Sequence, residues 1–483
     1  MRIIGREREQ KTLESCMLSG RPEFVAVYGR RRVGKTYLIR EYFNRNFAFY
    51  TTGVSGLNMK GQLKTFYGQL LEYGSSCKNE PKDWFKAFRM LKELLEQENV
   101  HRDPASSRIV VFIDELPWLD TPKSNFKSAL DFFWNSWASS REDVMLIVCG
   151  SATSWIINNL LNDTGGLYNR ITRSIHLQPF TLHECEELYR INNISMTRQQ
   201  IIQSYMVFGG IPYYINCMDR RLSLAQNIDA LIFNETGQLH YEFSRLYSSL
   251  FRNSKRHMMI IRALAKTGSG MTRSELTKQK GISDGQGLTK ALEELTQCGF
   301  IRKYLNLTKD LHSWYYQVID PFTLFHLRFI ENSTVKSWLL HVGTPGYYSW
   351  CGNAFELVCL LHIPQIKAVL GIQGVESSEY SWRSRKSEPG AQIDLVIDRK
   401  DDVINICEIK YVEGSFRINA SYEKQLQNKV TSFRRETAAV KAIHLTIITG
   451  SGLSHNAHSG IIMNEITGDD LFLPAKPQPF STV

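Results

Sequence analysis

A glycine-rich octet near the amino terminus constrains this chain more than any other stretch. Residues 29–36 read Gly-Arg-Arg-Arg-Val-Gly-Lys-Thr, after an apolar run at 24–28 and before a helical pattern at 37–43. A strand, Gly-x-x-x-x-Gly-Lys-Thr and a helix, in this order, are the setting of a phosphate-binding loop. The glycines permit a tight turn whose N–H groups, together with the helix N-terminus, point at phosphate oxygens. The octet therefore predicts a nucleotide site in an α/β fold.

The residue types of the octet suggest how ATP would be held. Lys35 is expected to reach the β- and γ-phosphates, and the Thr36 hydroxyl is expected to bind Mg²⁺. The residues predicted to contact the nucleotide from this loop are Gly29, Arg30, Arg31, Arg32, Val33, Gly34, Lys35, Thr36 and Tyr37.

A second apolar run, residues 109–113, ends in Asp114 and Glu115. Runs of this kind are typical of strands buried on both faces of a parallel sheet. Asp114, at the carboxyl end of such a strand, is expected to hold the Mg²⁺ shell, and Glu115 to orient or deprotonate the attacking water.

Two later features bear on the same site. Ser151 follows another apolar run at 144–149, where it suits either a polar sensor of the γ-phosphate or the N-cap of the next helix. Arg170 and Arg173 suit either arginine fingers or surface ion pairs. The alternation of strands and helices over the first 180 residues predicts a doubly wound, mostly parallel sheet.

Five short motifs together resemble those of prokaryotic archaeal-type ATPases, which are P-loop proteins close to the AAA+ and STAND ATPases. They are Ile-Gly-Arg-Glu at 4–7, the octet, Ile-Asp-Glu at 113–115, Gly-Ser at 150–151 and Gly-Ile-Pro at 210–212. The resemblance implies that Gly5 and Arg6 lie near the adenine. It also implies that the corner with Gly210 and Pro212 caps the nucleotide from a helical lid.

Residues 255–330 show three helical patterns followed by two short strand patterns, and they resemble a winged helix-turn-helix. Ten lysines and arginines stand against four acidic residues over 255–303, which favours DNA as a partner. Asp284, Glu293 and Glu294 surround or occupy the expected recognition helix, where carboxylates repel phosphates. A structural or inter-domain role for this segment therefore stays open.

The last third of the chain contains two alternating strands, at 392–397 and 404–410, joined by a short polar turn. One register of this hairpin places Asp394 opposite Glu408, and Lys410 shares a face with Glu408. A helix before the hairpin carries a single acid, Glu356.

Asp394 with Glu-x-Lys on one sheet face resembles the core of the PD-(D/E)XK nuclease-like fold. The resemblance implies that Glu356, Asp394 and Glu408 hold a second Mg²⁺, or Mn²⁺, beside the scissile phosphate, and that Lys410 positions or activates water. Lys424 and Lys429 are weaker candidates for phosphate contact. Gln392-Ile393 precede the aspartate where the family pattern has a proline. The alternative is an alternating hairpin with a chance Glu/Lys pair.

The composition of the chain indicates the cellular compartment in which the protein works. The chain begins with charged residues rather than a signal peptide, and it lacks an apolar stretch long enough for a bilayer. Its nine cysteines include no C-x-x-C pair, which is typical of reduced thiols. We therefore expect a cytoplasmic protein without membrane contact.

The sequence thus predicts an α/β chain of four parts. They are a P-loop ATPase core at 1–180, a helical lid at 181–254, a winged helix-turn-helix at 255–330 and a PD-(D/E)XK-like domain at 331–483. The predicted function is an ATPase whose nucleotide state gates a DNA-binding or DNA-cleaving domain, with a homo-oligomer or protein partner. The alternative is a STAND-like regulatory ATPase with an inactive DNA- or protein-binding module. A small-molecule kinase is a third interpretation, for which the sequence offers no evident acceptor site.

Overall fold

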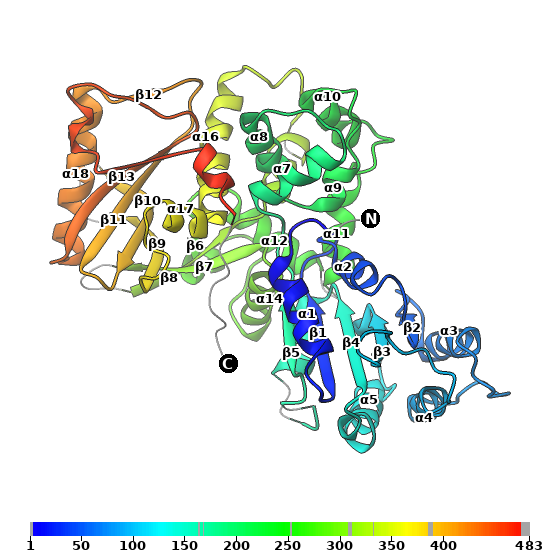
Figure 1. Ribbon diagram of the computed structural model, residues 1–483. Helices are drawn as coiled ribbons and strands as arrows, with labels where there is room; N and C mark the ends of the chain where they lie inside the picture. The colour runs from blue at the N-terminus through cyan, green and yellow to red at the C-terminus, as the bar shows by residue number, and fades with distance from the viewer. Residues whose placement is uncertain are drawn as a thin grey trace. The chain divides into compact units, whose positions relative to one another are not determined.

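Five strands pair into one parallel sheet in the first part of the chain (Figure 1). The order across the sheet is β2-β3-β4-β1-β5. The strands are β1 (Glu23–Tyr28), β2 (Phe49–Thr52), β3 (Ile109–Asp114), β4 (Val144–Gly150) and β5 (Arg173–His176). The central strands β3 and β4 are buried along their whole length, which is why their sequences are almost entirely apolar.

The computed structural model describes residues 3–162, 165–167, 169–251, 254–307, 312–331, 333–384 and 390–474. The chain divides into two compact units, Met1–Gln178 and Pro179–Val483. The first unit contains the parallel sheet. The predicted parallel α/β architecture of this part is confirmed.

Helices cover the sheet of the first unit because each presents an apolar face. Aromatic side chains of α3, α4 and α5 pack against the sheet, and they include Phe66, Trp84 and Phe133. The helices of this unit are α1 (Glu7–Met17), α2 (Lys35–Tyr42), α3 (Met59–Glu72), α4 (Trp84–Leu95), α5 (Phe126–Ser136) and α6 (Thr153–Ile156). These aromatic side chains therefore belong to the core of the first unit.

The second unit begins with short helices. They are α7 (Leu182–Ile191), α8 (Arg198–Phe208), α9 (Pro212–Asn216), α10 (Leu224–Ile228) and α11 (Glu242–Leu250). Gly209 is the C-cap of helix α8, and the next residue, Gly210, also has a positive φ of 67°. A Cβ at Gly210 would lie 2.2 Å from the Phe180 carbonyl oxygen, so only glycine fits this corner.

Three helices and a small antiparallel sheet follow. The helices are α12 (Ser254–Leu264), α13 (Arg273–Thr277) and α14 (Gln286–Gln297). The strands β6 (Met271–Thr272), β7 (Ile301–Leu307) and β8 (His312–Val318) pair in the order β6-β8-β7. The hairpin expected from the two strand patterns is present.

A second five-stranded sheet forms in the last part of the chain, in the order β15-β13-β11-β10-β9. Strands β10 and β11 pair antiparallel, whereas β11, β13 and β15 run parallel. The strands are β9 (Ser377–Arg383), β10 (Gln392–Arg399), β11 (Val403–Lys410), β13 (Ala442–Thr449) and β15 (Asn464–Thr467). A further short pair joins β12 (Phe416–Arg417) to β14 (Leu453–Ser454).

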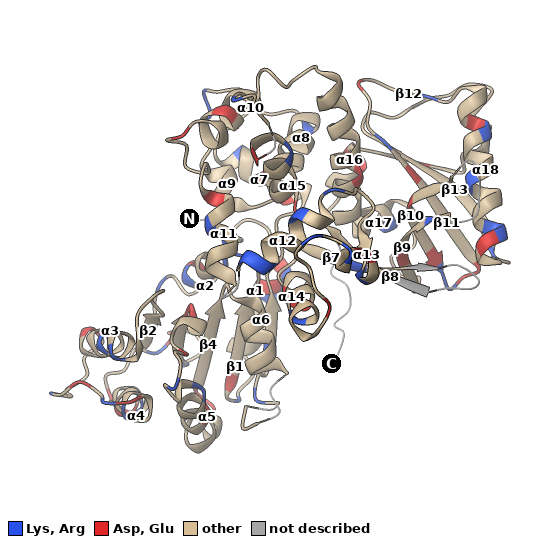
Figure 2. Cartoon of the chain, turned by 180° about the vertical axis from the view of Figure 1, so that it is seen from behind, with Lys and Arg blue, Asp and Glu red and all other residues tan. Residues whose placement is uncertain are grey.

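Helices flank this sheet on both sides, with α16 on one side and α18 on the other (Figure 1). Leu426 and Phe433 of α18 pack into the core on the sheet. Charged residues of both signs lie along α18 (Figure 2). The helices of this part are α15 (Pro321–His326), α16 (Pro345–Leu361), α17 (Ile363–Val369) and α18 (Ala420–Thr437).

Among the described residues, no helix combines the length and the apolar character needed to cross a membrane. The nine cysteines are all free thiols.

Candidate nucleotide site and acid–lysine site

The glycine-rich loop follows the carboxyl end of β1 and leads directly into α2. Gly29 has φ 142°, and a Cβ there would lie 2.3 Å from the Leu177 carbonyl oxygen at the end of β5. Gly34 has φ 95° and is the N-cap of α2. Both positions therefore require glycine, and together they turn the loop around the N-terminus of α2.

Lys35 lies inside this loop, where its side chain is 4% exposed. Its Nζ donates hydrogen bonds to the carbonyl oxygens of Gly29 and Arg30, at 2.9 and 2.7 Å. The ammonium group is thus held beside the backbone that a phosphate would contact. The other loop residues predicted to contact a nucleotide lie between the end of β1 and the first turn of α2; they are Arg31, Arg32, Val33, Thr36 and Tyr37.

The strand order brings the predicted acid to this loop. The Thr36 hydroxyl donates a hydrogen bond to Oδ2 of Asp114 at 2.7 Å. Burial raises the pKa of Asp114, and the bond from Thr36 opposes that shift. A hydroxyl and a carboxylate side by side at the carboxyl edge of a parallel sheet are oxygen ligands of the kind Mg²⁺ prefers.

Glu115 turns away from Asp114 toward the neighbouring strand β4. Its carboxylate accepts hydrogen bonds from the Ser151 backbone N–H at 3.2 Å and from the Ser151 hydroxyl at 2.5 Å. The N-cap of α6 is Ala152, without a side-chain hydrogen bond. The N-cap alternative for Ser151 is therefore wrong, because its hydroxyl is directed to Glu115.

Arg6 lies against the loop from the other side. Its guanidinium donates to the carbonyl oxygens of Val33 at 3.4 Å and Gln178 at 2.7 Å. Gly5 and Arg6 both have positive φ, at 57° and 63°, so the chain bends sharply before α1. The structure brings Arg6 to the glycine-rich loop, and its contact with an adenine stays a prediction.

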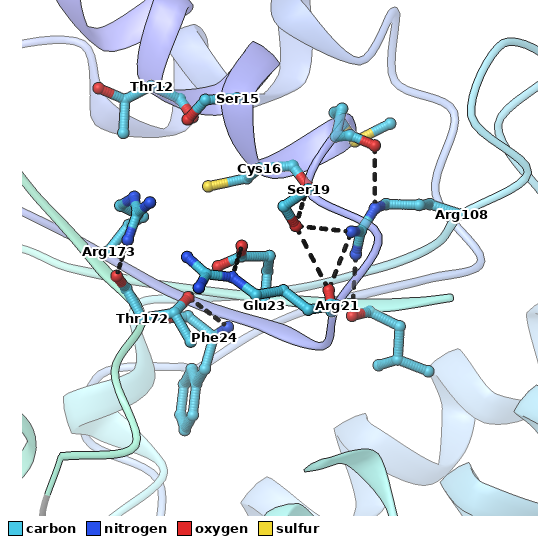
Figure 3. A network of polar contacts seen from close by, with 12 residues as sticks. Thr12, Ser15, Cys16, Ser19, Arg21, Glu23, Phe24, Arg108, Thr172 and Arg173 are labelled. Carbon is cyan, nitrogen blue, oxygen red and sulfur yellow. Dashed lines mark hydrogen bonds and ion pairs between the residues drawn. The ribbon is translucent and has the colours of Figure 1, made fainter. Parts of the chain in front are cut away.

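The structure does not bring Arg170 and Arg173 to the glycine-rich loop. Arg173 starts β5 and pairs with Val25, three residues before the end of β1, which corresponds to about 10 Å along a strand. Its Nη1 donates to the Thr172 carbonyl oxygen at 2.8 Å (Figure 3). Arg170 precedes it and is exposed. A finger acting on the loop of the same chain is not supported by this geometry.

Gly210 and Pro212 belong to the second compact unit. Pro212 is the first residue of α9, where proline suits the first helical turn. Their predicted role as a cap on the nucleotide stays a prediction.

The second cluster of acids lies on β10 and β11. Leu395 pairs with Cys407, and the next residues beyond this pair are Asp394 and Glu408, for which facing positions were predicted. Oδ2 of Asp394 accepts the backbone N–H of Ile409 at 3.4 Å. Lys410 Nζ lies 3.0 Å from Oε1 of Glu408.

Helix α18 supplies two further partners of Glu408, which is 1% exposed. The Tyr422 hydroxyl donates to Oε1 at 2.5 Å, and Lys429 Nζ donates to Oε2 at 2.6 Å. Lys429 thus contacts an acid of the cluster, whereas Lys424 is exposed. Sequence reasoning missed Tyr422, because its approach to Glu408 depends on how α18 packs on the sheet.

The pKa values of the acids in this cluster are shifted because three carboxyl groups lie close together in a buried place. Burial and the charge of Asp394 raise the pKa of Glu356 to about 8. Burial and Glu408 raise the pKa of Asp394 to about 6. Burial by itself would also raise the pKa of Glu408. The charges of Lys429 and Lys410 have the larger combined effect, so the pKa of Glu408 is lowered. Glu356 is therefore the acid of the three that holds its proton most strongly, whereas Glu408 is ionised between two lysines.

No group of three or more His, Cys, Asp and Glu side chains in the described part of the chain is arranged so that it could hold a metal ion. For Glu408 the reason is visible, since both of its oxygens are taken by lysines and a tyrosine.

A comparison with protein families finds a match for the first part of the chain. Residues 3–218 match the family described as an ATPase domain predominantly from Archaea. This match extends beyond Gln178 through α7, α8 and α9. The chain thus contains an archaeal-type P-loop ATPase domain.

Individual proteins are similar at a lower level. The uncharacterized protein MJECL04 of Methanocaldococcus jannaschii is 26% identical over 366 residues, which cover 74% of this chain and 76% of the relative. The Walker-type ATPase PABY2304 of Pyrococcus abyssi is 21% identical, with a TM-score of 0.46 over 68% of this chain and 96% of that one. The ORC2 protein of Aeropyrum pernix is 15% identical, with a TM-score of 0.40 over 68% and 93%. Both scores lie below 0.5.

Proposed function

We propose that this chain is an ATP-hydrolysing switch of the cytoplasm whose nucleotide state controls a DNA-binding or DNA-cleaving domain in its last third. The observation that carries the proposal is the facing set of Asp394, Glu408 and Lys410 on two paired strands. This set occurs in the same chain as an ATPase domain, so a nucleotide-dependent change has a second chemical site on which to act.

In the ATPase domain, Lys35 would hold the β- and γ-phosphates, and Glu115 would orient the attacking water. Thr36 and Asp114 would hold Mg²⁺, which neutralises charge on the phosphates when bound. Their 2.7 Å contact supports this assignment, because two oxygen ligands already stand together. Ser151 would fix Glu115 and sense the γ-phosphate through the same hydrogen bonds.

In the last third, Glu356, Asp394 and Glu408 would hold a divalent cation beside a scissile phosphate once the Glu408 oxygens had left their present partners. The raised pKa values of Glu356 and Asp394 support a cation there, since crowded buried carboxyls release protons when a positive charge arrives. Lys410 would position water or the phosphate, and Lys429 would hold Glu408 in place.

The rival function is a STAND-like regulator whose last domain binds DNA or protein without cleaving it. The specific observation in its favour is that Lys410, Lys429 and Tyr422 already satisfy both oxygens of Glu408. A cation would have to displace these partners before it could use Glu408.

Residues 255–330 would act as a winged helix in either case. The half-buried Arg273 is paired with Asp284 and hydrogen-bonds Thr289 on α14, so part of the basic charge near the expected recognition helix is already neutralised. A role in joining domains is therefore as well supported as DNA reading.

Arg170 or Arg173 would serve as an arginine finger only toward a second copy of the chain, which makes a homo-oligomer part of the proposal. ATP turnover per molecule should then rise with protein concentration. Constant specific activity over a wide dilution range would contradict a finger supplied in trans.

The test of the function is cleavage of plasmid and single-stranded DNA with Mg²⁺ or Mn²⁺, with and without ATP. Wild type is compared with Asp394→Asn, Lys35→Ala and the matched control Asp401→Asn, an exposed acid on the β10–β11 turn. The nuclease is supported if Asp394→Asn loses cleavage while the control keeps it. The ATP switch is supported if Lys35→Ala still cleaves DNA and no longer responds to ATP. ATP hydrolysis without any cleavage favours the regulator. Absence of ATP binding would contradict both.

A further inference from the structure

Helix α8 belongs to the ATPase family segment by sequence but to the second compact unit by its contacts. It packs against α16, the helix that carries Glu356, and against α15. One helix thus belongs to the ATPase family segment and also packs on the helix that carries an acid of the second site.

The first turns of α8 are anchored to the end of the last domain. Arg198 lies 3.7 Å from Asp469, and its guanidinium stands over the Phe472 ring at 4.7 Å. Ile202 packs so closely on Gly468 that a Cβ there would lie 2.9 Å from Ile202 Cδ1. These contacts hold α8 and the last domain together as one packed body.

The middle of α8 reaches the residue next to Lys410. The Gln203 amide nitrogen lies 3.2 Å from the hydroxyl of Tyr411 and 3.5 Å from that of Tyr347 on α16. Gln199, one turn earlier, is a second hydrogen-bond partner of the Tyr411 hydroxyl. Tyr411 directly follows Lys410 at the end of β11.

Tyr411 is also packed on two further sides, by Phe355 and by Gly450. Its ring centroid lies 5.2 Å from that of Phe355, the neighbour of Glu356 on α16. A Cβ at Gly450 would lie 3.0 Å from the Tyr411 ring, so β13 leaves no free space there. A shift of α8 that moves the Tyr411 hydroxyl must therefore move the backbone of Lys410 or the helix of Glu356.

The other end of α8 is the glycine corner. Gly209 and Gly210 both have φ 67°, and the corner leads into Pro212. This is the segment expected to cap the nucleotide, so one rigid helix of eleven residues runs from the proposed cap to Tyr411.

We propose that Tyr411 is a positioning residue through which α8 transmits the nucleotide state of the ATPase domain to Lys410 and Glu356. This inference rests on the proposed function, because it needs a nucleotide to bind the glycine-rich loop. It does not need the last domain to cleave DNA. The transmission is mechanical: α8 holds the Tyr411 hydroxyl through glutamine side chains, and Tyr411 is wedged beside both residues of the site.

The test is hydrogen–deuterium exchange of the full chain without nucleotide, with ADP, and with a non-hydrolysable ATP analogue, each with Mg²⁺. Nucleotide affinity is measured in parallel with a fluorescent analogue. Peptides that cover residues 403–411 and 353–361 report the site.

Tyr411→Phe removes the hydroxyl held by α8 and keeps the ring. Gln203→Met removes one donor and keeps the volume. Tyr380→Phe, a buried tyrosine on the edge strand β9 of the same sheet, is the matched control.

In wild type and Tyr380→Phe, the nucleotide is expected to change exchange at both peptides. In Tyr411→Phe, nucleotide affinity is expected to stay within about twofold while the change at these peptides falls at least about twofold. Gln203→Met is expected to show a smaller loss, because Gln199 remains. An undiminished change in Tyr411→Phe would overturn the inference. Nucleotide binding without any change in wild type would overturn the inference alone, whereas absence of nucleotide binding would overturn the proposed function and the inference with it.

Discussion

The carboxylate of Glu115 is fixed by Ser151, which donates to it through its hydroxyl and its backbone N–H. Glu115 has a left-handed backbone, with φ 44° and ψ 42°, which directs its side chain to the tip of β4 and away from Asp114. Two adjacent acids thereby face different partners: Asp114 faces Thr36 and Glu115 faces Ser151. This separation lets one acid serve a metal and the other a water molecule.

Glu115→Gln should preserve nucleotide binding and lower ATP turnover by about 10²–10⁴-fold, because glutamine keeps the shape of the side chain and cannot take a proton. Phosphate release and fluorescent nucleotide titration measure the two effects separately. Glu98→Gln, an exposed acid in a loop, is the control and should change neither. Turnover within about twofold of wild type in Glu115→Gln would remove Glu115 from the catalytic machinery.

Ser151→Ala should lower ATP turnover by about tenfold, because it removes a hydrogen bond to a charged group worth about 1.5–3 kcal/mol and leaves Glu115 less fixed. Ser151→Thr keeps the hydroxyl and should restore most of the rate. The measurement is kcat at saturating ATP. Equal losses in both variants would mean that space at the tip of β4 matters and the hydroxyl does not.

Arg108→Leu should destabilise the first unit by about 2–4 kcal/mol, since it removes the donor from three partly buried acceptors and from the buried Val144 carbonyl oxygen. The Arg108 guanidinium is 2% exposed and donates to the carbonyl oxygens of Met17 and Arg21 and to the Ser19 hydroxyl, which ties α1 to the sheet (Figure 3). Native-state hydrogen exchange of amides in β1 and β4 measures the free energy of opening.

The control for this variant is Arg102→Leu, which removes a half-exposed ion pair with Asp143 and should cost less than about 1 kcal/mol. If the two variants gave the same small loss, the buried network around Arg108 would have no special part in stability.

Acid should destabilise the second unit through His362. This side chain is fully buried: its Nδ1 lies 2.8 Å from the Val358 carbonyl oxygen and its Nε2 accepts the Leu182 N–H at 2.9 Å. Burial lowers the pKa of His362 to about 4, against a smaller opposite effect of the bond to Val358. The unfolded chain therefore binds the proton more tightly, and stability should fall by about 2–3 kcal/mol between pH 6.5 and pH 4.

The measurement is the unfolding midpoint from pH 7.5 to 4, in wild type and His362→Gln. Glutamine stays neutral, so the difference between the two proteins isolates His362 from other groups, including Asp394 and Glu356, whose raised pKa values act in the opposite direction. Parallel pH profiles for the two proteins would contradict the assignment.

Much of the nucleotide site could be predicted because its geometry is local. Gly29 and Gly34 occupy backbone positions that side chains do not tolerate, and the apolar runs before the loop and before Asp114 specify buried parallel strands. Strands of one parallel sheet end at the same edge, so Thr36 and Asp114 meet although 78 residues separate them. The antiparallel pairing of β10 with β11 was predictable for a similar reason, since a short turn and strict alternation leave few choices.

Other relationships were decided by packing between elements distant in sequence. Arg170 and Arg173 lie on the amino-terminal side of β5, which depends on the direction in which that strand joins the sheet. Tyr422 and Lys429 reach Glu408 because α18 covers one face of the sheet, and Gln203 reaches Tyr411 because α8 packs on the last domain. The sequence by itself determined the loop, the strands and their acids, because backbone conformation and hydrophobic periodicity act over a few residues. Only the tertiary structure decided which cations and hydroxyls hold those acids, because side-chain partners follow from the packing of whole helices, whose free energy is spread over many contacts.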